Sequence, residues 1–566
     1  MRSQPSRWAC PPYEVEAAAC LQATLGLSNT VATVLVRRGL SDPEQARQFL
    51  AADERNDPRG LPGAPAAAEL LLAHVARGSR IAVYGDYDVD GVCSTAILLR
   101  TLRALGADPL WELPHRFGDG YGLSHASVER FATRGVDLLI TVDCGITAVS
   151  EIAAARTAGM DVLVVDHHRA GETLPDCAIV HPALGDYACP ELCAAGTALK
   201  LAELVRVEAG LAAPADLVGA TELGPPAELL ELAALGTVCD LVPLRGENRR
   251  IVREGLRALT RTRSPGLRAL LAVAGAEPAE VDEQTIGFRL GPRLNAAGRM
   301  QRADAALELL MTADEARAAE IARELDLLNR DRRDAELRIV AEAEAAAATQ
   351  ASQGALVVAG EGWHPGVVGI VASRLVERWG RPAVVIALDG ERARGSGRSI
   401  AAYDLHAGLA ACDMHLHRFG GHRMAAGVEL DASAIEPFRR ALAAHAGAAL
   451  APAELIAVER VDAVVGGSVL GLGLAEELER LRPFGAANPQ PTLLVPAARV
   501  EGVVGMGDER QHARFTLVTG SSRARGVAFG TPPSAFADAS AEPHDIALRL
   551  ELNRWNGSVE PRVVMR

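Results

Sequence analysis

Lysine is almost absent from this sequence, because Lys200 is the only one among 566 residues. A phosphate-binding loop of the GxxxxGK[ST] type and a Schiff-base mechanism each depend on a lysine placed in a defined motif. A single lysine argues against both. Most motors driven by nucleoside triphosphates are thereby removed from consideration.

Long apolar segments and a secretion signal are also missing. No run of about 18 or more uncharged apolar residues occurs, the length that a membrane-spanning helix needs. The N-terminal sequence MRSQPSRWACPPYEVEAAAC lacks the apolar centre and cleavage site of a secretory signal peptide. We therefore predict a cytoplasmic protein that makes no contact with a membrane.

Cysteine is scarce and does not form paired motifs. The nine cysteines are an odd number scattered along the chain. No paired C-x-x-C knuckles accompany the group Cys177, Cys189 and Cys193, so a structural zinc site there is only an alternative. We predict reduced thiols that pack in the interior.

Positive charge is in deficit, with a formal net charge of −14. Proteins that coat nucleic acid through overall basicity carry a positive net charge. Any grip on nucleic acid must therefore be local, and arginine must supply it.

The chain is too long for one hydrophobic core, since single cores stop growing near about 250 to 300 residues. Between residues 80 and 180, short apolar runs alternate with helical patterns, which is typical of a parallel α/β sheet. We predict the following division: an N-terminal helical segment (1–65), a parallel-sheet α/β domain (66–311), a connecting helix (312–350), a smaller α/β domain (351–450) and a C-terminal barrel of the oligonucleotide-binding (OB) type (451–566).

Acidic residues follow the apolar runs of the first α/β domain. Asp86, Asp88 and Asp90 alternate directly after the run IAVY, and their mutual repulsion implies a bound cation. An EF-hand loop begins in the same way, but Ile97 stands where its last ligand, a glutamate, is required.

Further acids and histidines recur in equivalent places: Asp143, the run Asp166-His167-His168, and Asp240. The carboxyl ends of parallel strands meet at one edge of a sheet, so these side chains are expected to converge. Carboxylates with an imidazole suit Mn²⁺ or Mg²⁺, and one carboxylate can bridge two ions. The pattern predicts a two-metal hydrolase.

The ordered motifs DYDVDG, VDCG and DHH with the later Asp240 resemble the DHH phosphoesterase superfamily. Within it, GPRLNAAGR (291–299), GWHPG (362–366), GGH (420–422) and PFG with Asn488-Pro489 resemble RecJ-type exonucleases. The resemblance implies a metal-dependent exonuclease specific for single-stranded DNA that works 5′ to 3′ and releases 5′ mononucleotides in DNA recombination and repair. It also implies a DHH domain, a DHH-associated domain and an OB-type barrel.

The resemblance carries ligand roles over by position. The implied ligands of two Mn²⁺ or Mg²⁺ ions are Asp86, Asp88, Asp90, Asp143, His167 and Asp240, with Asp143 as the bridge. His168 is expected to touch the scissile phosphate. Arg116, Arg293 and Arg299 are candidate phosphate clamps, because guanidinium pairs bidentately with phosphate oxygens.

Other residues are expected to hold the DNA strand. Trp363 and Phe484 are candidate stacking platforms, with core packing as the alternative. Glycine-rich stretches are expected to offer exposed backbone N–H groups to the DNA backbone. The remaining candidates for DNA contact are His364, Arg374, Ser396, Gly397, Arg398, Gly421, His422 and Asn488.

Two other functions stay open. One is a different DHH enzyme, such as an oligoribonuclease or a cyclic-dinucleotide phosphodiesterase, although the barrel-like tail argues against small substrates. The other is a non-catalytic protein that binds single strands, although a scaffold without activity has no reason to keep repelling carboxylates. We expect a monomer whose partners include a helicase and a single-strand-binding protein.

Overall fold

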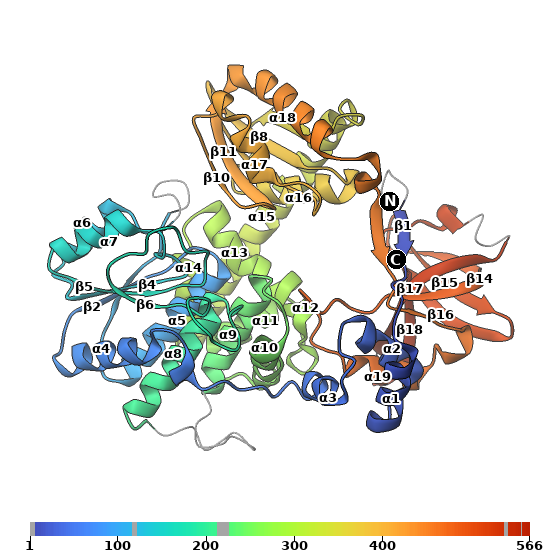
Figure 1. Ribbon diagram of the computed structural model, residues 1–566, viewed down its shortest axis with the longest axis horizontal. Helices are drawn as coiled ribbons and strands as arrows, with labels where there is room; N and C mark the ends of the chain where they lie inside the picture. Colours follow the sequence, from blue (N-terminus) through green and yellow to red (C-terminus); the bar gives the residue numbers. More distant parts are fainter. Residues whose placement is uncertain (1–5, 116–121, 212–225, 537–541, 556, 566) are drawn as a thin grey trace. The chain divides into compact units, whose positions relative to one another are not determined.

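The computed structural model describes residues 6–115, 122–211, 226–536, 542–555 and 557–565. The chain divides into two compact units. Figure 1 labels the helices and strands of both. Unit 1 comprises Met1–Arg47, Asp331–Leu481 and Gln490–Arg566, and unit 2 comprises Gln48–Arg330 and Arg482–Pro489. Within the described ranges, no helix is both long and apolar enough to cross a bilayer.

Unit 2 is built on a five-stranded parallel sheet in the order β3-β2-β4-β5-β6. Val83 of β2 pairs with Ile140 of β4, which pairs with Leu163 of β5. All five strands therefore end at the same edge. The strands are β2 (Ile81–Tyr84), β3 (Leu110–Glu112), β4 (Leu138–Val142), β5 (Asp161–Val165) and β6 (Ala178–Val180).

Helices cover both faces of this sheet, which is why its strands read as continuous apolar runs. Ile81 and Val83 pack among residues of α4, α5 and α8, while Ala82 and Tyr84 pack against α6 and α7. The helices of unit 2 are α4 (Ala64–Ala76), α5 (Val89–Ala104), α6 (His125–Thr133), α7 (Val149–Thr157), α8 (Ala194–Glu208), α9 (Ala227–Cys239), α10 (Gly246–Leu259), α11 (Pro265–Val273), α12 (Glu283–Thr285), the π-helix η3 (Ile286–Leu290), α13 (Gly291–Met300) and α14 (Asp304–Met311).

The segment Arg482–Pro489 is distant in sequence from the rest of unit 2 but folds as part of it. The buried Arg249 holds it by donating to the carbonyl oxygens of Arg482 and Pro483 at 2.6 and 3.2 Å. Leu244, four residues after Asp240, donates its backbone N–H to the carbonyl of Ala486 at 2.9 Å. The segment therefore braces the chain that follows Asp240.

Unit 1 contains a mixed sheet in the order β10-β11-β9-β8-β7. Its strands are β7 (Leu356–Glu361), β8 (Ala383–Asp389), β9 (Arg392–Arg398), β10 (Arg418–Gly421) and β11 (Ala425–Asp431), and its helices are α16 (Val368–Trp379), α17 (Leu405–Ala410) and α18 (Ile435–Ala449). Gly395 and Gly397 lie on β9, which pairs with β8 and β11. This corrects the expectation of exposed backbone N–H groups there, because a central strand uses its backbone in the sheet ladders.

The C-terminal part of unit 1 is a closed barrel, which confirms the predicted OB-type fold. Strand β14 pairs with β15 and also with β17, so the ladder β14-β15-β16-β18-β17 closes on itself. The strands are β14 (Leu493–Met506), β15 (His512–Thr519), β16 (Ser522–Ala528), β17 (His544–Trp555) and β18 (Ser558–Met565), with β13 (Ala463–Val464) on the edge of β14 and helix α19 (Leu472–Glu479) preceding the barrel.

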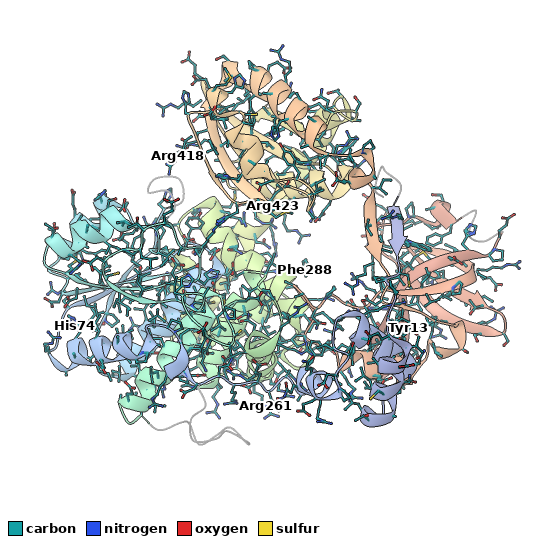
Figure 2. All side chains as sticks on the ribbon, viewed as in Figure 1. Tyr13, His74, Arg261, Phe288, Arg418 and Arg423 are labelled. Carbon is teal, nitrogen blue, oxygen red and sulfur yellow. The ribbon has the colours of Figure 1, made fainter. Side chains whose placement is uncertain are left out.

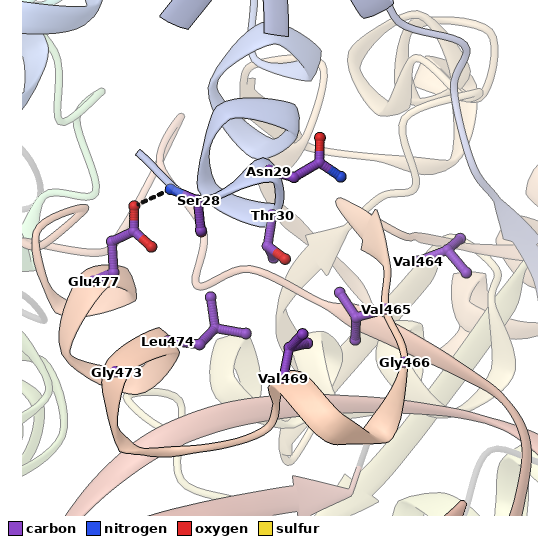
Figure 3. Close-up of a pocket in the computed structure, with 10 residues that line it drawn as sticks. All are labelled: Ser28, Asn29, Thr30, Val464, Val465, Gly466, Val469, Gly473, Leu474 and Glu477. Carbon is purple, nitrogen blue, oxygen red and sulfur yellow. Dashed lines mark hydrogen bonds between the residues drawn. The ribbon is translucent and has the colours of Figure 1, made fainter. Parts of the chain in front are cut away.

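The N-terminal segment packs beside the barrel within unit 1. It contains β1 (Ser6–Ala9), α1 (Val15–Leu25) and α2 (Asn29–Arg37), and β1 pairs in parallel with β12 (Ala457–Arg460). Helix α3 (Pro43–Ala51) begins in unit 1 and ends in unit 2. A cavity of about 430 Å³ lies between Ser28, Val464 and Leu474 (Figure 3). Ser28 donates its backbone N–H to Glu477 across this cavity at 2.6 Å.

The expected connecting helix is present as α15 (Glu315–Ala348). Its first half belongs to unit 2 and its second half to unit 1, because the boundary falls at Arg330 and Asp331. Its exposed side carries ion pairs one turn apart, such as Arg317 with Glu320 at 2.8 Å. Pairs of this spacing stabilise a long solvated helix.

Candidate metal centre

Four acidic segments meet at the carboxyl edge of the parallel sheet in unit 2. Asp86 follows β2, Asp143 follows β4 directly, and Asp166 follows β5 directly. Asp240 caps the C-terminus of α9. The sheet topology alone brings the strand-borne positions together, because the strands are parallel and neighbouring.

The structure places all six predicted metal ligands in one cluster. Three sets have ligand atoms within 4.8 Å of one another: Asp86, Asp88 and Asp143; Asp90, His167 and Asp240; and Asp143, His167 and His168. His167 Nε2 lies 3.3 Å from Asp143 Oδ1 and 3.7 Å from Asp240 Oδ2. Asp143 and His167 each belong to two sets, so they connect the cluster.

Two buried atoms in this cluster have no hydrogen-bond partner among the described residues, namely Asp143 Oδ1 and His167 Nε2. Burial and the charge of His168 lower the pKa of His167 to about 4, so its imidazole is neutral and Nε2 can present a lone pair. An unpartnered carboxylate oxygen and a ring nitrogen facing one another fit a divalent cation.

The carboxyl groups of the cluster repel one another in the absence of a cation. Burial and then the neighbouring carboxylates raise the pKa of Asp143 well above its usual range. Burial, followed by Asp90 and Asp88, raises the pKa of Asp240 to about 8. The same acids would be ionised beside a divalent cation, because an opposite charge favours the charged form.

Asp90 is fixed by the start of α8. Its two carboxylate oxygens accept the backbone N–H groups of Ala194 and Ala195 at 2.7 and 2.9 Å. Burial and Asp88 nevertheless raise the pKa of Asp90 to about 6. A β-carbon on Gly236 would stand 2.5 Å from Asp90 Oδ1, so only glycine fits opposite this carboxylate.

Asp88 caps α5 by accepting the backbone N–H groups of Asp90 and Gly91 at 3.0 and 3.1 Å. This contact starts the helix at Val89, inside the acidic motif. Gly91 is required because a β-carbon there would meet the Asp86 backbone at 2.6 Å. Asp86 and Asp88 therefore lie in the loop before α5, and Asp90 lies in its first turn.

Asp143 adopts a left-handed backbone conformation, with φ of 60°. Leu241, directly after Asp240, does the same with φ of 59°. Non-glycine residues in this region are strained and cluster at functional sites. The strain therefore falls on one clustered carboxylate, Asp143, and on the residue directly after another, Asp240.

Asp166 is a functional residue that the predicted ligand set omits. Its Oδ1 accepts from the backbone N–H groups of His167 and His168, and Oδ2 accepts from Ile146 N–H. His168 Nδ1 lies 2.8 Å from Oδ1. The run Asp166-His167-His168 could have indicated this role from the sequence, because an acid directly before two histidines can orient both.

The three predicted phosphate clamps have different outcomes. Arg116 lies outside the described residues. Arg293 donates to Asp326 and to the carbonyls of Arg289 and Val273, and its role as a phosphate clamp stays a prediction. Arg299 lies beside Gly298, whose β-carbon would meet Tyr87 O at 2.6 Å. Arg299 therefore sits next to the loop that bears Asp86 and Asp88.

Several predicted DNA contacts gather in the sheet domain of unit 1. Arg398 donates to Ser396 Oγ at 2.9 Å, and both face Gly369 at the start of α16. His364 accepts the Gly366 N–H just before that helix. Arg374 is exposed on α16 and pairs with Glu336 and Glu377 at 3.4 Å.

Trp363 is 5% exposed and donates its indole N–H to Glu342 at 2.6 Å. It also packs flat against Gly360, where a β-carbon would stand 2.2 Å from the ring. This burial favours the alternative of core packing for Trp363 over a stacking platform. Gly421 and His422 are exposed at the turn between β10 and β11.

Phe484 and Asn488 are buried in unit 2, at 8% and 0% exposure. Asn488 donates to the carbonyl of Pro483 at 2.7 Å and pairs with Gly485 through the backbone. The guanidinium of Arg482 covers the Phe484 ring at 5.2 Å. Both residues therefore shape the bracing segment, which favours core packing over stacking for Phe484, and their contact with DNA stays a prediction.

Family models match most of the chain. Residues 80–237 match the DHH family, N-terminal domain; residues 352–447 match the DHHA1 domain; and residues 461–566 match the RecJ OB domain. The first match contains Asp86, Asp143 and His167 but ends before Asp240. The first match lies in the parallel-sheet part of unit 2. The second covers the mixed sheet of unit 1, and the third covers the barrel.

Relatives and solved structures agree with these matches. The single-stranded-DNA-specific exonuclease RecJ of Bacillus subtilis (strain 168) is 38% identical over 100% of this chain and 71% of its own length. The protein of that name from Dickeya dadantii (strain 3937) is 36% identical over 88% of this chain and 89% of its own. RecJ from Thermus thermophilus in complex with Mn²⁺ aligns with a TM-score of 0.84 and 32% identity, over 99% of this chain and 78% of that one. The chain belongs to the RecJ family of single-stranded-DNA-specific exonucleases.

Proposed function

We propose that this protein is a single-stranded-DNA-specific exonuclease that removes 5′ mononucleotides in the 5′-to-3′ direction during DNA recombination and repair. The observation that carries the proposal is the cluster of Asp86, Asp88, Asp90, Asp143, His167 and Asp240 around two unpartnered buried atoms. Family membership supports it, since the relatives bear that activity in their names.

The cofactor is a pair of Mn²⁺ or Mg²⁺ ions held by those six residues. RecJ from Thermus thermophilus has been solved with each of these metals. Bound in this cluster, the ions supply a water of lowered pKa and neutralise charge on the leaving oxygen. Asp143 is the proposed bridge, because its carboxylate takes part in two of the three ligand sets.

His168 is the proposed phosphate contact. Burial alone would lower its pKa, but the hydrogen bond and charge of Asp166, with Asp240 and Asp86, raise the pKa to about 9. Asp166 holds the ring through Nδ1, and a protonated imidazole in a fixed orientation suits contact with a phosphate oxygen. Arg299 is the proposed second cationic contact.

The sheet domain of unit 1 is proposed to hold the DNA backbone through Ser396, Arg398 and His364, close to the start of α16. Helix N-termini and hydroxyl groups are common phosphate contacts. The OB-type barrel is proposed to bind single-stranded DNA as well. A cytoplasmic location, a monomeric state, and a helicase and a single-strand-binding protein as partners stay predictions.

The test is nucleotide release from 5′-labelled single-stranded DNA, duplex DNA, short RNA and a cyclic dinucleotide, each with Mn²⁺ and with EDTA. We expect mononucleotides from the single strand only, and none with EDTA. Release from the cyclic dinucleotide or the short RNA alone would replace the proposal with another DHH activity. Tight binding of the single strand without any cleavage would indicate a non-catalytic protein.

A further inference from the structure

Phe288 is 79% exposed, which is more than any other aromatic side chain in the described part of the chain. It projects from the surface of unit 2, where Figure 2 labels it. Phe529 and Trp8 follow at 55% and 40% exposure, and both belong to unit 1. An exposed phenyl ring keeps its burial free energy available, so a flat apolar partner that covers Phe288 would gain it.

The backbone around Phe288 creates this exposure. Phe288 is the middle residue of the π-helix η3, whose first and last residues, Ile286 and Leu290, are fully buried. A π-helix inserts an extra residue into a turn, and such turns often mark functional sites. Here the insertion keeps the two flanking side chains in the core and pushes the phenyl ring outward.

The turn that carries Phe288 is held on both sides. Arg289 donates to the carbonyl oxygens of Ala274 and Gly275. Before the turn, Asp282 and Thr285 form a capping box at the start of α12. Arg482 of the bracing segment pairs with Glu283 at 2.7 Å. A platform fixed in this way loses little conformational entropy when a ligand stacks on it.

The π-helix also lies against the metal centre's own scaffold. A β-carbon on Gly287 would stand 3.7 Å from Val238, and one on Gly291 would stand 2.5 Å from the Cys239 sulfur. Asp240 follows Val238 and Cys239 directly. The α-carbons of Phe288 and Asp240 are therefore at most about 20 Å apart. This bound adds one peptide step from Phe288 to Gly287, the contact with Val238, and two steps to Asp240, at about 3.8 Å per step.

We propose that Phe288 is a stacking platform for a nucleobase of the single strand whose reacting end lies at the metal centre. The proposal rests on the proposed exonuclease function. An unpaired base offers a flat apolar face to an exposed, rigid phenyl ring, and every base has such a face, so the contact is tolerant of sequence. No other aromatic side chain described in unit 2 approaches this exposure.

The proposal can be tested by removing the Phe288 side chain and, separately, single bases of the DNA strand, and comparing the two effects on binding. Binding of 3′-fluorescein oligothymidylate is measured in EDTA, where no cleavage occurs, with a series of strands that each carry one abasic residue. We expect one abasic position to weaken binding by the wild-type protein about 5- to 150-fold, the range of a single stacked base. Phe288→Ala should weaken binding of the intact strand similarly and should lose its response to that position.

Two variants control the experiment. Phe288→Trp should restore both the affinity and the response, because it restores a flat aromatic face. Leu184→Ala removes another exposed apolar side chain of unit 2, 40% exposed, and should change neither. With Mn²⁺, Phe288→Ala should raise KM and leave kcat unchanged, as expected when binding is lost equally in ground and transition states.

The proposal would be overturned if Phe288→Ala bound the intact strand as the wild type does. It would also be overturned if that variant kept the wild-type response to the abasic position, or if its oligomeric state changed while its DNA affinity did not. The exonuclease proposal is judged separately, by metal-dependent nucleotide release from the wild-type protein. Base-dependent binding without cleavage would therefore keep the platform and reject the nuclease. Metal-dependent cleavage together with unchanged DNA binding by Phe288→Ala would keep the nuclease and reject the stacking platform.

Discussion

His168 Nδ1 lies 2.8 Å from Oδ1 of Asp166, and the Asp166 carboxylate also receives three backbone N–H groups. Burial would raise the pKa of Asp166, but His168 and these backbone donors lower it to about 2. The carboxylate is thus permanently charged at neutral pH and fixes one ring nitrogen of His168. A residue outside the predicted ligand set therefore orients the proposed phosphate contact.

Asp166→Asn is expected to reduce kcat by about 10- to 100-fold, the usual loss when an orienting partner is removed. The pKa of His168 should fall from about 9 toward its ordinary 6.5. A group with a raised folded pKa stabilises the fold below its unfolded pKa and loses that contribution as pH rises through the folded value. Stability from this pair should therefore be full between pH 3.8 and pH 6.5. It should be lost as pH rises through about 9, where His168 deprotonates, and as pH falls through about 2, where Asp166 protonates.

The measurement is the ring-proton NMR titration of His168 in metal-free protein, compared between wild type and Asp166→Asn. Urea midpoints on either side of that pH window supply the matching stabilities. An unchanged His168 titration in the variant would contradict the assigned pairing.

Asp143→Asn is expected to lower nucleotide release by more than about 100-fold, because loss of a direct ligand exceeds the loss of an outer-shell partner. The fold should survive, since asparagine tolerates the left-handed backbone found at this position. Circular dichroism and thermal unfolding check the fold, and Mn²⁺ binding by calorimetry checks the site. Metal-dependent activity near the wild-type level would refute the bridging role.

Removal of metal is expected to make the protein less stable at high pH. The pKa values of Asp90 and Asp240, about 6 and about 8, exceed the ordinary value of 3.8. Stability is therefore fully present below pH 3.8 and lost as pH rises through these values, because the fold must then contain repelling charges. In EDTA, the melting temperature should fall between about pH 5 and about pH 9.

Asp240→Asn separates this repulsion from general pH effects. In EDTA at about pH 8.5 the variant should melt several degrees above wild type, since about 1 kcal/mol corresponds to roughly 2–4 °C in a domain of this size. With Mn²⁺ the order should reverse, because wild type gains more from the bound ions. The same order in both conditions would count against a metal role for Asp240.

Glu231, which lies outside the predicted ligand set, is expected to make the stability of the fold depend on pH. Burial raises its pKa from 4.5 to about 7, against the lowering effects of Thr262 and Arg100. Its contribution to stability is full below pH 4.5 and is lost as pH rises through about 7. Glu231→Gln should therefore stabilise the fold at about pH 8.5 by up to about 3 kcal/mol and have little effect at about pH 4.5.

The control for that experiment is Glu228→Gln, which changes an acid of the same helix whose side chain is 60% exposed. It should be nearly neutral at both pH values. Equal effects of the two variants across pH would contradict the buried ionisation of Glu231.

The metal centre could be predicted from the sequence because its geometry follows from local patterns. Each ligand segment follows an apolar run, parallel strands end at one edge, and the topology then brings Asp86, Asp143 and His167 together. The barrel was predictable for a similar reason, because short alternating strands separated by glycines leave few folds that bury them. Periodicity is a local property, so one chain suffices to show it.

Burial of individual polar and aromatic residues was decided only by the tertiary structure. The motifs of Trp363 and Phe484 leave stacking and core packing equally open, and in the structure Glu342 contacts the first ring and Arg482 the second. Arg293 resembles a phosphate clamp in its motif, and in the structure Asp326, 33 residues later, accepts a hydrogen bond from its guanidinium. Partners such as these are set by packing between segments distant in sequence, and no local pattern encodes them. The sequence by itself determined which acids gather at the sheet edge, and the tertiary structure decided which other side chains remain available to the substrate.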